Sequence, residues 1–305
     1  MNPNEGTPEQ YIVQSREKIR EMFGVAISTL QKDGGTMSLS DQVEVASTME
    51  IPAIQFDFRN RTIEEIQEGL EALLQYRSAH PDVVISIHGD TPKIDETDIS
   101  IQNHDRLLEE LKIVQELIGE SYTVHPPSVQ SKLFESLSPE VRATVIDRYA
   151  AIFCGAITAA YAQGKKFSVA IENMSAQGEE GAWGQKVEDI LFLIQKIEKE
   201  LIAQGVDPIA AHEYVGATLD VNHALYEVNV PDYQTILETW FKGLGDYLKV
   251  IHLYTPSALN TKFSEKYRLC LDLAAQYSPH ARLLMESKQD TSVTTEVYAA
   301  ARQIE

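Results

Sequence analysis

Short apolar runs of strand type recur along the chain, and seven of them stop at an acid or a histidine. In chain order, the residues that end these runs are Asp57, His88, His125, Glu172, Asp220, His252 and Glu286. Successive members of this series are 31 to 48 positions apart, which leaves room for a helix and two loops after each strand. The runs are apolar on both faces, so they predict strands of a parallel sheet that is covered by helices.

Helices are predicted between these runs. They are expected at 39–50, 62–78, 101–118, 138–163, 184–204, 231–245, 261–277 and 291–304. Thr62 with Glu65 forms a capping-box pattern, and Ser138 precedes a proline at the first turn of another helix. With the first strand at Gly24–Leu30, eight strands and eight following helices predict a (β/α)8 TIM barrel. The alternative, an open doubly wound sheet, usually carries a glycine-rich phosphate turn, and the sequence has no GxGxxG or Walker pattern.

The chain is expected to form a single domain, because no linker rich in Pro, Ser or Gly divides it. Residues 1–7 are typical of a disordered tail, and Pro8–Phe23 is typical of a polar helix. We therefore predict a tail and an extra N-terminal helix over 1–23, followed by the barrel over 24–305.

The composition limits the classes of binding partner that this chain is expected to have. A net charge of -20 argues against broad attachment to nucleic acid or to anionic membranes. No stretch approaches 18 uninterrupted apolar residues and no secretory signal pattern begins the chain, so no membrane association is expected. Cys154 and Cys270 are the only cysteines, which fits a reducing, cytoplasmic location. A small-molecule partner is expected, and a homo-oligomer is left open.

The polar strand ends predict a metal site. A parallel barrel places the carboxyl ends of all its strands on one side, where active sites of such barrels are built. Glu172, Asp220, His252 and Glu286 end four neighbouring strands, and three carboxylates with one imidazole suit Mn2+, Mg2+, Co2+ or Zn2+. Burying three uncompensated acids together would be very unfavourable, and a divalent ion would remove that cost.

Further residues are candidates for a second ion or for substrate contacts. His88, His125 and His223 would either hold a second ion that shares Glu172 or contact substrate oxygens, although a lone strand-end histidine is more often structural. Three weaker candidates for substrate binding each have an alternative. They are Asp57 (a cap or salt bridge), Trp183 in the loop 173–184 (packing of that loop) and Lys288 (the barrel rim).

Five sequence runs resemble the xylose isomerase-like TIM barrel superfamily. They are Thr123-Val124-His125-Pro126-Pro127, Val169-Ala170-Ile171-Glu172-Asn173-Met174, Leu219-Asp220-Val221-Asn222-His223-Ala224, Ile251-His252-Leu253 and Leu284-Met285-Glu286-Ser287-Lys288. The resemblance covers roughly residues 24–290. This superfamily includes sugar and sugar-phosphate isomerases and epimerases, and also DNA-repair phosphodiesterases of the endonuclease IV type.

The resemblance implies that the superfamily's metal quartet falls on Glu172, Asp220, His252 and Glu286. It also implies that Glu172 and Glu286 act as the catalytic acid/base pair. The expected activity is therefore isomerisation or epimerisation of a sugar or sugar phosphate, by proton transfer through a metal-stabilised enediolate. One or two divalent ions are expected.

Two alternative functions remain open. The first is a zinc phosphodiesterase of the endonuclease IV type that acts on abasic DNA. Histidines that match His88, His125 and His223 belong to the trinuclear zinc site of these enzymes. Those enzymes also carry an Asp-x-His pair after the strand-seven histidine, and 253–261 contains neither residue type. His125 is followed by Pro126-Pro127, where Pro-Gly is common in isomerases of this superfamily. The last alternative is a barrel that binds a ligand without turnover.

Overall fold

The computed structural model describes most of the chain. The described residues are 8–27, 31–32, 35–95, 98–117, 119–129, 134, 137–175, 183–225, 233–254, 261–287 and 291–304. The predicted tail at 1–7 and the end of the first predicted strand, 28–30, lie outside this set.

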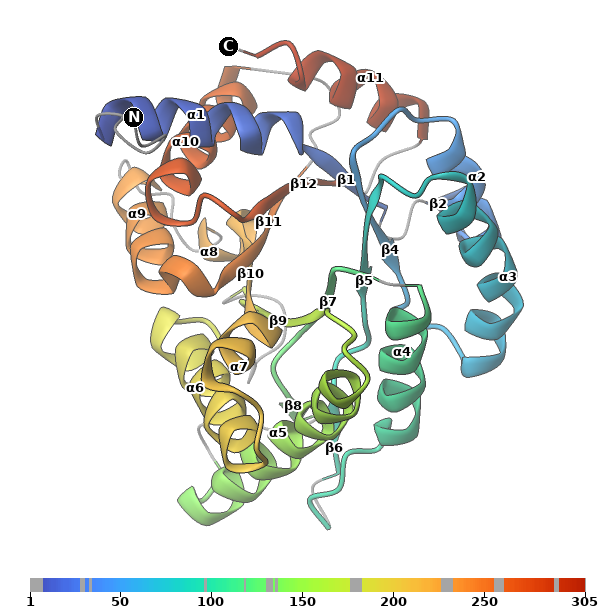
Figure 1. The fold of residues 1–305 in the computed structure, drawn as a ribbon, viewed down its shortest axis with the longest axis vertical. Coiled ribbons are helices and arrows are strands. Elements are labelled where there is room, and N and C mark those ends of the chain that lie inside the picture. Colours follow the sequence, from blue (N-terminus) through green and yellow to red (C-terminus); the bar gives the residue numbers. More distant parts are fainter. Residues whose placement is uncertain are drawn as a thin grey trace.

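Eight parallel strands close into a barrel, which confirms the predicted fold (Figure 1). The barrel strands are β1 Gly24–Ile27, β4 Ala53–Asp57, β5 Val84–His88, β7 Ser121–Val124, β9 Ser168–Glu172, β10 Val215–Asp220, β11 Leu248–Tyr254 and β12 Arg282–Ser287. Closure is direct, because β1 pairs with β4 on one side and with β12 on the other. The register pairs Asp57 with His88 and Asp220 with His252, so these strand ends lie at one level.

Helices surround the strands (Figure 1). Those that match the predicted series are α2 Leu39–Ser47, α3 Ile63–Ala79, α4 His104–Glu116, α5 Pro139–Ala162, α6 Val187–Ala203, α9 Tyr233–Leu244, α10 Thr261–Tyr277 and α11 Thr291–Ala301. The extra N-terminal helix is α1, Pro8–Glu21, which packs on α10. The short helices α7 Pro208–Tyr214 and α8 Val221–Leu225 and the 3-10 turn Gly245–Tyr247 were not predicted, because segments this short carry little hydrophobic periodicity.

Side-chain caps begin several helices where the sequence indicated them. Ser38 and Thr62 each form a capping box with the acid three residues later. Ser138 accepts a hydrogen bond from the backbone N–H of Val141, and Pro139 follows at the first turn. Two small sheets lie outside the barrel, β2 Gln31–Lys32 with β3 Gly35–Thr36 and β6 Lys93–Ile94 with β8 Ser128–Val129. The second of these joins the loops that follow β5 and β7.

The helix α5 is long and apolar enough to cross a membrane by length and composition, and it is alone in this among the described residues. Half of its apolar window is buried within the fold. It packs between α4 and α6, so its apolar character is explained by its place in the helical layer.

The barrel interior contains both a small apolar cluster and a set of polar side chains. Ala26, Ala53, Val250 and Leu284 form the apolar cluster. Beside it, Gln55 Nε2 donates to Thr123 Oγ1 at 3.0 Å, and the hydroxyls of Thr123 and Thr218 are also 3.0 Å apart. These bonds satisfy the buried polar groups that lie beneath the strand ends.

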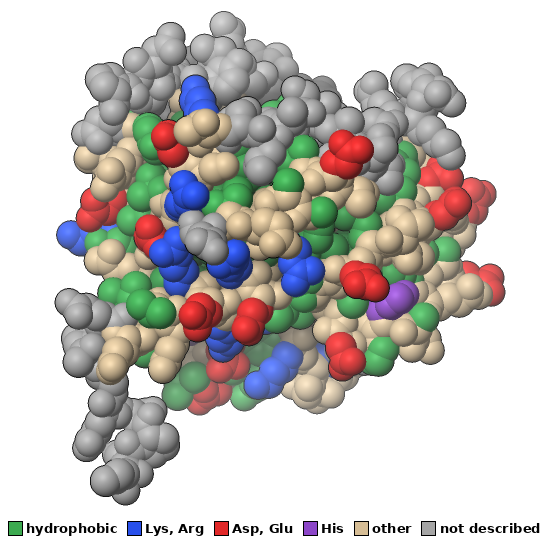
Figure 2. All heavy atoms as spheres, turned by 90° about the horizontal axis from the view of Figure 1, so that it is seen from above, with side chains coloured by type: hydrophobic (Ala, Val, Ile, Leu, Met, Phe, Trp, Pro, Cys, Tyr) green, Lys and Arg blue, Asp and Glu red, His purple; other side chains and the backbone are tan. Residues whose placement is uncertain are grey.

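The outer surface carries both signs of charge. Figure 2 shows the face on which α1 and α11 lie, where Lys and Arg side chains gather among Asp and Glu side chains. On this side, Arg16 of α1 pairs with Asp272 of α10 at 3.3 Å. Local basic groups therefore occur on a chain whose net charge is -20.

Candidate metal centre

The strand-end acids and imidazoles converge around Glu172. On one side of this carboxylate, Oε2 lies 2.8 Å from Nε2 of His88 and 3.6 Å from Nε2 of His125. On the other side, Oε1 lies 3.6 Å from Nδ1 of His252 and 3.7 Å from Nδ1 of His223. Four of the predicted histidines therefore contact one buried acid.

Ligand-type atoms form three overlapping groups, each with its atoms within 4.8 Å of one another. The groups are His88–Glu172–His252, Glu172–Asp220–His223 and Asp220–His252–Glu286. Three members of the predicted quartet therefore share one group. Glu172, the fourth member, joins Asp220 in one neighbouring group and His252 in the other. The structure thus brings all four together, and their role as metal ligands stays a prediction.

Backbone and hydroxyl partners orient the histidines. Nδ1 of His88 lies 3.1 Å from the carbonyl oxygen of Gly89, and Nδ1 of His223 lies 2.8 Å from that of Asn173. A carbonyl only accepts, so Nδ1 carries the proton in both rings, and Nε2 keeps a lone pair when the ring is neutral. Nδ1 of His125 is likewise engaged, by the Thr91 hydroxyl at 2.8 Å.

Several buried atoms in this cluster have no hydrogen-bond partner. They are Nε2 of His88, Nε2 of His125, Oε2 of Glu172 and both ring nitrogens of His252. Buried polar groups are normally hydrogen-bonded, so this concentration needs an explanation. Donor atoms about 2.1 Å from a divalent ion stand roughly 3 to 3.5 Å from each other. The separations around Glu172 are close to this spacing, so the donor set fits a shared divalent ion.

The charges of the cluster are coupled. Burial raises the pKa of Asp220 to about 6, and the neighbouring Glu286 and Glu172 add to that rise. Burial opposes the charged form of His252, but Glu172 raises its pKa above the usual value. By contrast, burial and then Arg59 lower the pKa of His88. Protons in the cluster therefore favour Asp220, His223 and His252 over His88.

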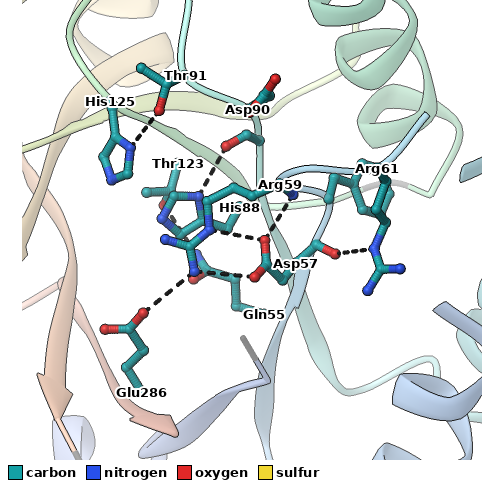
Figure 3. A network of polar contacts seen from close by, with 12 residues as sticks. Gln55, Asp57, Arg59, Arg61, His88, Asp90, Thr91, Thr123, His125 and Glu286 are labelled. Carbon is teal, nitrogen blue, oxygen red and sulfur yellow. Dashed lines mark hydrogen bonds and ion pairs between the residues drawn. The ribbon is translucent and has the colours of Figure 1, made fainter. Parts of the chain in front are cut away.

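Arg59 is a site residue that sequence reasoning missed. Figure 3 shows it between Asp57 and Glu286. Its Nε and Nη2 lie 3.0 and 3.1 Å from the two carboxylate oxygens of Asp57, and Nη2 lies 3.6 Å from Oε1 of Glu286. Burial would raise the pKa of Asp57, but Arg59 lowers it. Asp57 thus forms the salt bridge that was its alternative prediction, and its role in substrate binding stays untested.

Asn173 ties two strand ends together. Its Oδ1 accepts from the backbone N–H of Asp220 at 2.6 Å, and its Nδ2 donates to the carbonyl of Asp220 at 3.1 Å. Its own carbonyl faces His223. Asn173 follows Glu172 directly, so one residue fixes the ends of β9 and β10 and the ring of His223. It stood in a quoted sequence run, but no role was predicted for it.

The remaining candidates lie apart from the cluster or outside the described residues. Trp183 stacks on Phe134 with ring centroids 4.7 Å apart, and its other ring contact is with Phe192 of α6. It is 9% exposed, so the described contacts are those of loop packing, and its role in substrate binding stays a prediction. Lys288 lies outside the described residues, as do 176–182 and 255–260.

Comparisons with known proteins find likeness in structure alone. No family model matches the chain, and no curated protein matches it. Endonuclease IV from Thermus thermophilus superposes with a TM-score of 0.58 at 18% identity, covering 92% of this chain and 98% of that one. D-allulose 3-epimerase from Methylomonas sp., in complex with D-allulose, gives 0.56 at 13% identity and covers 93% of each chain.

A third structure is a xylose isomerase-like TIM barrel protein from Mycobacterium smegmatis in complex with magnesium. It gives a TM-score of 0.55 at 12% identity, covering 92% of this chain and 95% of that one. All three identities are low, so these likenesses establish architecture and not reaction. The chain has the fold of the xylose isomerase-like TIM barrel proteins.

Proposed function

We propose that this protein is a divalent-metal-dependent isomerase or epimerase that acts on a small sugar or sugar phosphate. One observation carries the proposal. The strand order β9–β10–β11–β12 places Glu172 and Glu286 at the two flanks of Asp220 and His252. A substrate bound at the central pair would therefore have a carboxylate on either side.

Asp220, His252 and Glu286 would hold the ion, with Glu172 beside them. When bound, a divalent ion supplies Lewis acidity, which polarises a substrate carbonyl and stabilises developing negative charge. The two glutamates divide the proton transfer. One carboxylate takes the proton from the carbon next to the carbonyl, and the other delivers a proton to the product.

Neighbouring residues suit a polyhydroxy substrate. Nη1 of Arg59 has no hydrogen-bond or ion-pair partner among the described residues, so it can donate to a substrate oxygen. Nε2 of His125 is also without a hydrogen-bond partner and stands ready for a hydroxyl or for a second ion. The net charge of -20 supports a small substrate over a nucleic-acid backbone. The likeness to an epimerase solved with D-allulose supports the substrate class.

The test is exchange of substrate hydrogen with solvent. A panel of aldoses, ketoses and their phosphates is incubated in D2O with the protein and Mn2+, Co2+, Zn2+ or Mg2+, and deuterium is followed by NMR. We expect deuterium to enter at least one compound, and Glu286→Gln to abolish the exchange. Glu296→Gln, an exposed glutamate of α11, is the matched control and should retain full activity. Absence of exchange in every compound would overturn the proposal.

A zinc phosphodiesterase of the endonuclease IV type is the second candidate. His88, His125 and His223 all contact Glu172, as ligands of additional ions would, and the fold covers 98% of an endonuclease IV chain. The acidic net charge and the missing Asp-x-His pair oppose it. Elemental analysis separates the two candidates: about one ion per chain supports the isomerase, and two or three support phosphoester chemistry. Cleavage of abasic-site DNA with Zn2+ would establish the second.

A cytoplasmic location is part of the proposal. Cys154 and Cys270 are free and buried, and burial raises the pKa of each thiol to about 12. Such thiols are inert packing groups, which suits a compartment that keeps cysteines reduced. A homo-oligomer remains a prediction that size-exclusion chromatography with light scattering would test.

A further inference from the structure

A cavity of about 310 Å3 lies at the opposite end of the barrel from the metal centre. Its walls come from residues at which strands begin. Ser121 and Ser168 are the first residues of β7 and β9, Arg282 is the first of β12, and Lys249 is the second of β11. The cavity is therefore the mouth of the barrel at the N-terminal ends of its strands.

Small residues leave this mouth open. The interior layers of TIM barrels are usually filled by bulky branched side chains. Here two serines line the cavity, and the second residue of β10 is Gly216. A Cβ on Gly216 would overlap Cγ of Lys249, so the lysine stem lies directly against the glycine backbone. The absence of a side chain at Gly216 thus gives Lys249 its place in the cavity wall.

The cavity carries more positive than negative charge. Its cations are Lys18, Lys166, Lys249 and Arg282, and its acids are Glu120 and Glu213. Arg282 makes a bidentate pair with Glu120 at 2.9 and 3.1 Å, and Lys166 lies 3.7 Å from Glu213. Both acids are thereby used. Lys18 and Lys249 have no hydrogen bond or ion pair with any described residue, so two cations remain without partners.

The two free lysines come from different parts of the fold. Lys249 is partly buried, and burial lowers the pKa of its ammonium group, a fall that the charges of Glu213, Asp246 and Glu198 offset only in part. Lys18 belongs to α1, the helix that the eightfold barrel repeat does not require. An excess of two positive charges in one cavity contrasts with the net charge of -20. A bound anion would compensate both the desolvated charge of Lys249 and the excess of positive charge in the cavity.

We propose that this cavity binds the phosphate group of a small phosphate ester through Lys249 and Lys18. A phosphate dianion matches the two unpaired ammonium groups in charge, and its oxygens accept from several donors at once. The hydroxyl of Ser168 is a further donor on the wall, and the rings of Phe167 and Tyr214 offer an apolar side to the organic part of the ester. The site is remote from the metal centre, so it does not depend on the proposed isomerase activity.

The test measures phosphate affinity in the full-length protein by isothermal titration calorimetry. Inorganic phosphate and glycerol 3-phosphate are titrated at constant ionic strength, with NaCl setting the background. Lys249→Met keeps the stem and removes the charge, Lys18→Met does the same on α1, and Lys242→Met is the control on exposed α9. We expect Lys249→Met to weaken binding about tenfold or more, as loss of a charged hydrogen bond does. Lys18→Met should weaken it less, and Lys242→Met should leave it unchanged.

The variants also separate this cavity from the metal centre. Phosphate bound at a metal ion would keep its affinity in Lys249→Met, and equal affinities in that variant and the wild type would overturn the proposal. Lack of binding of both compounds by the wild type would overturn it as well. Circular dichroism checks that Lys249→Met folds. Should it fail to fold, Lys18→Met decides, because Lys18 is exposed and its loss disturbs no packing. Tighter binding of glycerol 3-phosphate than of inorganic phosphate would identify the ester as the ligand.

Discussion

Nε2 of His88 lies 2.8 Å from Oε2 of Glu172, but neither atom has a hydrogen-bond partner. Nδ1 of the same ring faces the carbonyl of Gly89 and therefore carries the proton. Burial and then Arg59 lower the pKa of His88, although Glu172 opposes the fall, so the neutral ring, whose Nε2 presents a lone pair to the carboxylate, is favoured. Two lone-pair atoms repel at this distance unless a cation stands between them. The pair therefore fits two ligands of one metal ion, and this role stays a prediction.

Removal of metal should destabilise the protein. The buried acids Glu172, Asp220 and Glu286 repel one another without an ion, and an ion that binds only the folded state adds RT ln(1 + [L]/Kd). At a concentration of 100 Kd this amounts to about 2.7 kcal/mol, or roughly 4 °C in Tm for a chain of 305 residues. Thermal unfolding of chelator-treated protein with and without Mn2+, Zn2+, Co2+ or Mg2+ measures the effect. An unchanged Tm with all four ions would rule out the metal centre.

Metal affinity should fall as the pH falls. The pKa of Asp220 is raised to about 6, and that of His252 is raised above its usual value. A raised pKa means that the ligand holds its proton at a higher pH, and the metal must displace that proton. We expect affinity to fall by about tenfold per pH unit below pH 6 for Asp220 alone, and more steeply with His252. Competition titrations between about pH 5 and 8 measure this; a flat profile would contradict the ligand assignment.

Asp57→Asn should be strongly destabilising. Its carboxylate holds the Arg59 guanidinium, whose side chain is 18% exposed. Removing one partner of a buried ion pair typically costs about 3 to 5 kcal/mol in the free energy of unfolding. Because Arg59 lowers the pKa of Asp57, the pair's stabilisation is present above the ordinary aspartate pKa and is lost as the pH falls through the lowered one. Urea unfolding of Asp57→Asn, Arg59→Met and the double variant measures the coupling; additive effects would show that the pair does not act as a unit.

The sequence was sufficient to predict the barrel and to predict that the candidate site lies at the carboxyl ends of its strands. Seven of the eight barrel strands have an acid or a histidine within two residues of their carboxyl ends, and a parallel barrel has to gather these residues at one rim. The convergence on Glu172 follows from topology, because His88, His125, Asp220 and His252 end strands that curve around the same axis. The polar residues at the strand ends therefore predicted that these side chains meet.

Hydrophobic periodicity could not predict the side-chain positions that depend on the conformation of local turns. Arg59 enters the site because its backbone N–H donates to Oδ1 of Asp57 at 2.8 Å and Asn60 adopts a left-handed φ of 58°. A left-handed residue of this kind leaves no repeating signal in the sequence. The position of Arg59, two residues after the strand-end Asp57, was nevertheless a sequence signal that it could belong to the site. The orientation of His88 likewise depends on a backbone carbonyl, which sequence patterns do not reveal.

Gly89 couples the fold to the metal centre. Its carbonyl fixes Nδ1 of His88, and a Cβ at this position would overlap the hydroxyl and ring of Tyr122. The Tyr122 ring has little freedom to move, because it is fully buried and its hydroxyl donates to Glu110 at 2.5 Å. The backbone of Gly89 therefore has to lie against Tyr122, and His88 takes its position from that contact.

Gly89→Ala should accordingly reduce both stability and metal affinity. Overpacking of this kind typically costs about 1 to 3 kcal/mol in the free energy of unfolding. Displacing the partner of a ligating histidine typically lowers metal affinity about 10- to 100-fold. Gly155→Ala is the matched control, because it lies in α5 with open space around the new methyl group and should stabilise by about 0.5 to 1 kcal/mol. Urea unfolding and Zn2+ titration measure the two effects. If Gly89→Ala lowers stability but leaves Zn2+ affinity at the level of the control, then His88 does not ligate the ion.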